Sequence, residues 1–110
     1  FRFVLFLTGV NFSWFKSAIT GPAAATAKSG VEARTTVDNT DGSDYVAAIA
    51  TAMVINDTIM DAADAIAVIE GVIVNGANAG NLQLQWAQNA SSATATIVQA
   101  NSYLIAHKLN

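Results

Sequence analysis

The chain has 110 residues, no cysteine, one proline and a formal net charge of −3, and only 12% of its residues are charged against 53% that are hydrophobic. The lack of cysteine excludes a disulfide scaffold and thiolate metal sites. Five scattered Lys and Arg residues form no phosphate-binding stripe, so we expect no nucleic-acid partner. The length fits one domain. Alanine contributes 22 residues, and with so little charge this favours a chain that packs against copies of itself.

The N-terminal third predicts strands separated by short turns. Phe1–Val10 is aromatic or branched at both alternating sets of positions, which predicts a strand covered on both faces. Asn11–Ile19 predicts a second strand, and a Gly-Pro turn follows it at Thr20–Ala23. Ala23–Gly30 is small and featureless, which predicts a loop. Val31–Val37 alternates apolar residues with charges, as a half-buried strand does.

The middle of the chain is less regular. Asp38–Asp44 predicts a turn-rich loop. Tyr45–Ile59 mixes helix-forming alanines with strand-forming branched residues, so both structures stay open. Ala65–Val74 predicts a clear strand, and Asn75–Asn81 predicts a hairpin connection in which Asn and Gly supply positive φ angles.

The C-terminal third predicts three more strands. Leu82–Gln88 alternates so that Leu82, Leu84 and Trp86 point inward. Thr96–Gln99 and Ser102–Leu109 are the last strands. Seven or so short strands of this spacing predict an all-β sandwich or barrel in a single domain, residues 1–110. No window reaches the roughly 18 apolar residues of a membrane-spanning helix, so we expect no membrane partner.

The acidic loop is the first candidate site. Asp38, Asp41 and Asp44 are weak candidates for calcium ligands, since hard cations take carboxylate oxygens. The EF-hand spacing fails because the twelfth position is Ile49 rather than Glu. An exposed turn, in which the Asx side chains bond their own backbone, is the favoured interpretation, and we expect no metal site.

Other polar or aromatic residues form no catalytic arrangement. Glu70 is the charge within an apolar strand, and we expect it to pair with an arginine or to face an interface. His107, the single histidine, suits a packing or interface role. Trp14 and Tyr45 are weak candidates for stacking on a sugar ring, which gives a carbohydrate-binding receptor-recognition module as the alternative function. We expect neither an enzyme nor a cofactor.

Several segments resemble the C-terminal domains of tailed-bacteriophage virion proteins, which occur on tail fibres, neck appendages and capsid decorations. The segments are VIEG at Val68–Gly71, NGANAG at Asn75–Gly80, LQLQWAQN at Leu82–Asn89, VQANSYL at Val98–Leu104, the opening FRFVLFL at Phe1–Leu7, and Gly21-Pro22. Family members usually have Gly where this chain has Asn101, and asparagine tolerates a positive φ better than most residues do. They also carry one or two strands upstream, so with Phe1 in first position we expect a fragment that lacks those strands.

The resemblance implies a jelly-roll-like antiparallel β-sandwich that forms a trimer around a three-fold axis. It implies a virion location, a structural role in assembly and in adsorption to the host, and other virion proteins as partners. A glycan of the host surface is a further implied partner.

Overall fold

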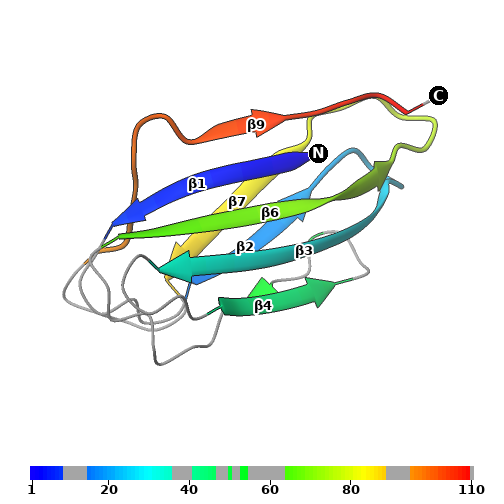
Figure 1. The fold of residues 1–110 in the computed structure, drawn as a ribbon. Coiled ribbons are helices and arrows are strands. Elements are labelled where there is room, and N and C mark those ends of the chain that lie inside the picture. Colours follow the sequence, from blue (N-terminus) through cyan, green and yellow to red (C-terminus); the bar gives the residue numbers. More distant parts are fainter. Residues whose placement is uncertain are drawn as a thin grey trace.

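The computed structural model describes residues 1–8, 15–35, 41–46, 50, 53–54, 64–88 and 95–109. All regular structure in these ranges is β-strand in two antiparallel sheets, with no helix among them (Figure 1). The all-β prediction is confirmed. The described strands are β1 (Arg2–Thr8), β2 (Phe15–Thr20), β3 (Thr26–Thr35), β4 (Asp41–Val46), β5 (Met53–Val54), β6 (Asp64–Val74), β7 (Gln83–Gln88), β8 (Ile97–Val98) and β9 (Tyr103–Ile105).

The larger sheet has six strands in the order β4-β3-β6-β1-β8, and β9 also pairs with β1. β6 pairs with β1 from Arg2 opposite Glu70 to Thr8 opposite Asp64, and with all ten residues of β3. The backbone of Phe1 extends this ladder, since its nitrogen donates to the Gly71 carbonyl at 2.9 Å and Gly71 donates back at 3.0 Å. β6 is therefore the central strand on which the sheet is built.

β8 and β9 lie along the same edge of β1 and act as one interrupted strand. β8 pairs with the end of β1 and β9 with its beginning. Asn101 turns the chain between them with a φ of 70°. The Ser102 hydroxyl closes the gap in the ladder, because it accepts the Phe6 N–H at 3.0 Å and donates to the Gln99 carbonyl at 2.8 Å. Gln99 donates its own N–H to the Phe6 carbonyl at 2.7 Å.

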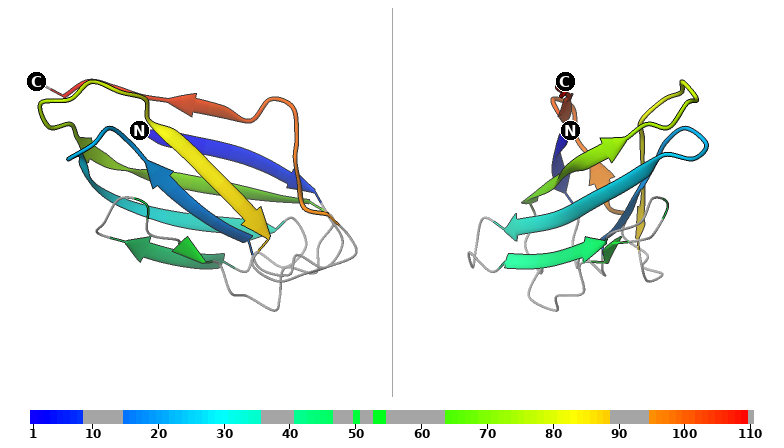
Figure 2. Two further views of the ribbon diagram at one scale, coloured as in Figure 1. Left: turned by 180° about the vertical axis from the view of Figure 1, so that it is seen from behind. Right: turned by 90° about the vertical axis from the view of Figure 1, so that its right-hand side faces the viewer.

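The smaller sheet, in the order β5-β2-β7, packs against one face of the larger sheet in a sandwich-like arrangement (Figure 2). The apolar side chains between the two sheets form the core: Phe3, Leu5, Leu7, Ile19, Val31, Met53, Ala65, Ala67 and Ile69. Ser29 also lies in this layer and donates to the Met53 sulfur at 3.6 Å. The face of the larger sheet turned toward the smaller sheet is called the inner face below, and the opposite one the outer face.

The loop predicted at Ala23–Gly30 is wrong, because β3 begins at Thr26. In this segment Ala25, Ala27 and Ser29 are buried, while the residues between them are exposed. Small residues therefore fill the inner face along this segment. Because small residues have a low strand propensity, the sequence did not reveal the alternation of buried and exposed positions that the structure shows.

The predicted acidic loop is also wrong in part, because Asp41–Asp44 belong to β4. β4 pairs with β3, and Arg34 stands opposite Asp41 in the register. In the ambiguous segment Tyr45–Ile59, the described regular structure is strand: the end of β4, and β5.

The connection at Asn75–Asn81 is not a hairpin, since β6 and β7 belong to different sheets. No described glycine has a positive φ; Ala24, Ala50 and Asn101 do. The glycines of this connection instead allow close contact with the Gly-Pro turn. A Cβ added at Gly80 would lie 3.1 Å from the Pro22 ring, and one at Gly76 would lie 3.2 Å from the Ala24 carbonyl oxygen.

We predict that Gly71→Ala destabilises the fold. A Cβ at Gly71 would overlap the Lys28 carbonyl oxygen and lie 2.8 Å from the Ser29 Cα, and neither backbone atom yields without moving β3 from β6. Overpacking of this kind costs about 1–3 kcal/mol, measured as the free energy of unfolding in denaturant. Asn75→Ala, at an exposed position just beyond β6, serves as the control. Equal stabilities of the two variants would contradict the close packing.

We also predict that Ser102→Ala lowers stability and that Ser17→Ala does not. Loss of the Ser102 hydroxyl leaves the part-buried Phe6 N–H without its acceptor, at a cost of about 1–3 kcal/mol or roughly 5–15 °C in Tm. Ser17 Oγ is buried and has no hydrogen-bond partner, so removing it leaves nothing unpaired. Thermal melts at one fixed concentration test both variants, and a Tm for Ser102→Ala at or above that of Ser17→Ala would refute this role of Ser102.

Candidate functional site

The outer face of the larger sheet is the main candidate for a functional surface. Residues opposite one another in a ladder share a face of the sheet. Because Phe3, Leu5 and Leu7 of β1 lie in the core, the residues between them lie on the outer face. The register adds their partners on β6 and, across the other edge of β1, on β8 and β9.

This outer face is apolar. Among the described residues, nine large hydrophobic side chains are classed as exposed, and six of them lie on it: Ile66, Val72, Val74, Ile97, Tyr103 and Ile105. Val4 and Phe6 lie between them on β1, and Val68 lies opposite Val4 on β6. Val4 is already buried by its neighbours on the same face. The strand predicted at Phe1–Val10 is confirmed for β1, but of its two apolar faces the smaller sheet covers only one.

Charged side chains are few on the outer face, and both signs occur. Arg2 and Glu70 stand opposite each other and form an ion pair, with 3.7 Å between Nε and Oε2 and more than half of each side chain exposed. The expected pairing of Glu70 with an arginine is confirmed. The other charged residues whose described side chains lie on this outer face are Lys28 and Glu32 on β3 and Asp64 on β6.

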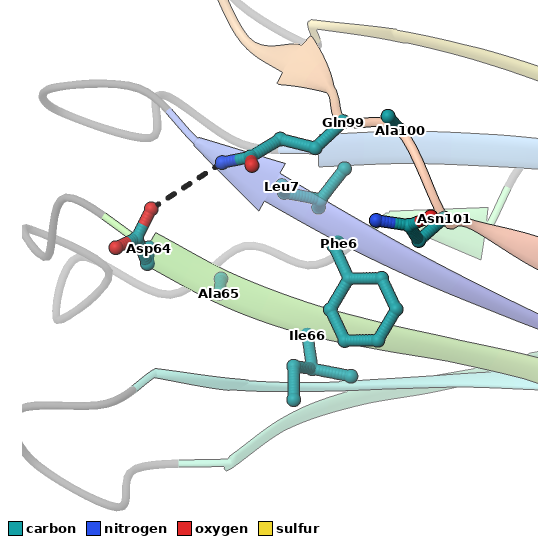
Figure 3. Close-up of a pocket in the computed structure, with 8 residues that line it drawn as sticks. All are labelled: Phe6, Leu7, Asp64, Ala65, Ile66, Gln99, Ala100 and Asn101. Carbon is teal, nitrogen blue, oxygen red and sulfur yellow. Dashed lines mark hydrogen bonds between the residues drawn. The ribbon is translucent and has the colours of Figure 1, made fainter.

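A shallow pocket lies at one end of the outer face, where the β8–β9 turn meets β1 and β6. Figure 3 shows the Phe6 ring beside Ile66, and the Gln99 amide donating to an Asp64 carboxylate oxygen at 3.5 Å. The pocket is lined by Phe6, Leu7, Asp64, Ala65, Ile66, Gln99, Ala100 and Asn101. Asp64 is the one ionisable side chain in its lining.

Two aromatic or titratable residues are more exposed than expected. Trp86 is predicted to point into the core, and the register places it opposite the buried Ser17, on the same face of the smaller sheet as Leu84. Leu82 and Leu84 pack against the core, but Trp86 is 41% exposed because β7 is an edge strand of the smaller sheet. His107 follows β9 and is exposed, which excludes the packing role within the described part of the chain, and the interface role stays a prediction.

The remaining candidate residues are not brought together into a site by the described structure. Trp14 and Asp38 lie outside the described residues. Asp41, Asp44 and Tyr45 lie on β4, at the edge of the larger sheet remote from β8 and β9. Two features of the sequence indicated this outer face. They are the low charge of the chain and the apolar residues at both alternating sets of positions in its first strand.

Within the described ranges there is no group of three or more His, Asp or Glu side chains placed to hold a metal ion. Those ranges also contain no helix long and apolar enough to cross a membrane. No protein-family model, curated protein or solved structure matches this chain.

Proposed function

We propose that this chain is a structural subunit of a tailed-bacteriophage virion, an appendage domain of the tail fibre, neck or capsid-decoration type. In this proposal the two sheets belong to a jelly-roll-like sandwich, and three copies assemble around a three-fold axis. Its work is mechanical and adhesive: it joins other virion proteins and serves adsorption to a glycan of the host surface. No catalytic role is included.

The observation that carries the proposal is the amount of apolar surface on a single chain. Nine large hydrophobic side chains are between 41% and 74% exposed among the described residues. Contiguous apolar surface of this kind marks contact sites in soluble proteins, and a chain with 12% charged residues has little else to cover it.

The turn between β8 and β9 is compatible with the resemblance. Asn101 stands where the resembling domains usually have glycine, and its φ of 70° lies in the left-handed region that glycine and asparagine accept. The departure from the family's pattern at this position therefore leaves the backbone conformation intact.

We predict that the purified chain is an oligomer of three copies. Native mass spectrometry and light scattering should give about 34 kDa for an 11.4 kDa chain. A well-folded monomer that persists from low to high micromolar concentration would overturn the self-assembly.

An antibody raised against the chain should label the appendages or the head of purified phage particles from its source. Absence of label on intact particles would overturn the virion role.

A further inference from the structure

We infer that the outer face of the larger sheet is the surface through which copies of this chain contact one another. The inference rests on the proposed self-assembly and adds the surface that performs it. It identifies the occupants of that face as the neighbouring copies of the same chain, so that in a three-fold assembly the face turns toward the axis.

The apolar residues of the outer face form continuous rows across the strands. One row runs from Tyr103 on β9 through Val4 to Val68. The next pairs Phe6 with Ile66. Farther along β6, beyond the Arg2–Glu70 ion pair, the exposed Val72 and Val74 add a second apolar group on the same face. Branched side chains lose little conformational entropy on burial, so these rows suit a packed contact between two sheets.

The area of the outer face fits a stable protein–protein contact. β6 has eleven residues, which at ~3.4 Å per residue gives a length of about 37 Å. Five strand positions at ~4.8 Å give a width of about 20–24 Å, but the other strands are shorter than β6, so the face covers roughly 600–700 Å². A standard specific interface buries about 800 Å² on each partner, and crystal-type or chance contacts bury much less.

The charges on this face favour another copy over a lipid surface. Arg2 and Lys28 are balanced against Glu32, Asp64 and Glu70. A nearly neutral face with both signs present does not repel its own copy. It also offers no excess of positive charge to anionic lipids. The exposed Arg2–Glu70 pair lies within the face, where the same two groups on a neighbouring copy can exchange partners with it.

Strand addition at the β8–β9 edge is the rival mode of association, and the edge is poorly built for it. β8 has two residues and β9 has three, and the Gln99–Ser102 turn interrupts them. Short, interrupted edge strands are what proteins use to prevent pairing between edges. Contact through the outer face therefore suits this sheet better.

Lysine substitutions separate the two modes. Val72→Lys and Ile105→Lys place a charge on the outer face, and burying it between copies should weaken association by roughly 100-fold or more. Leu104→Lys is the matched control. It lies on the same strand as Ile105 at nearly equal exposure, 45% against 44%, but it stands opposite Phe3 on the inner side of the sheet. Sedimentation velocity over a concentration series measures association, and circular dichroism checks the fold of each variant.

Cysteine labelling gives a second readout that does not depend on a charged substitution. The chain has no cysteine of its own, so Val74→Cys on the outer face and Leu109→Cys beyond β9 each add one thiol. Both positions are well exposed in the single chain, at 61% and 74%. In the oligomer, Val74→Cys should react with a maleimide at least about tenfold more slowly than Leu109→Cys.

The outcomes distinguish this inference from the proposed function. Dissociation by Val72→Lys and Ile105→Lys but not by Leu104→Lys, with protection of Val74→Cys, supports contact through the outer face. An oligomer that survives both outer-face lysines, or in which the two thiols react equally fast, overturns this inference and leaves the proposed function standing. Dissociation by Leu104→Lys alone overturns it in favour of contact through the inner side of β9. A wild-type chain that is a monomer at all concentrations overturns both.

Discussion

The pairing of β6 with two neighbours along almost its whole length positions every other part of the larger sheet. Its ladder with β1 and its ladder with β3 together use all eleven of its residues. The contact with β3 is close at Gly71, which stands opposite Ser29. The backbone of β3 there leaves no room for a side chain at Gly71. Small residues along the inner face of both strands, such as Ala67 and Ala27, let the large side chains of β1, β2 and β5 fill the space between the sheets.

This construction gives β6 two apolar faces and covers only one of them. Antiparallel sheets in soluble domains commonly alternate apolar residues toward the core with polar residues toward water. Here Ile66, Val72 and Val74 occupy outward positions that usually carry charge. A strand with this pattern on both sides is typical of a sheet buried between two layers. The smaller sheet supplies one layer, and under the proposed function a neighbouring copy supplies the other.

The sequence predicted the strands whose large residues alternate and missed those whose inward residues are small. β1 and β6 were predicted nearly to their ends because branched and aromatic side chains mark them. The first half of β3 was predicted as a loop, since its buried positions are alanine and serine. Trp86 was assigned to the core from its spacing, but spacing does not reveal that β7 lies at a sheet edge. The outer face could be predicted only in part. The low charge of the chain was visible in the sequence, but the strand register that gathers Tyr103, Val4 and Val68 into one row was not.

The β8–β9 turn shows how the chain limits the ways in which it can associate. An unbroken strand along β1 would present a long apolar edge, which pairs readily with any similar strand. The left-handed Asn101 and the Ser102 hydroxyl interrupt that edge, yet they leave the Phe6 N–H paired. The interruption therefore removes the edge as a site of association without loss of backbone hydrogen bonding. The outer face has no equivalent interruption, and under the inference above it is the surface through which the copies associate.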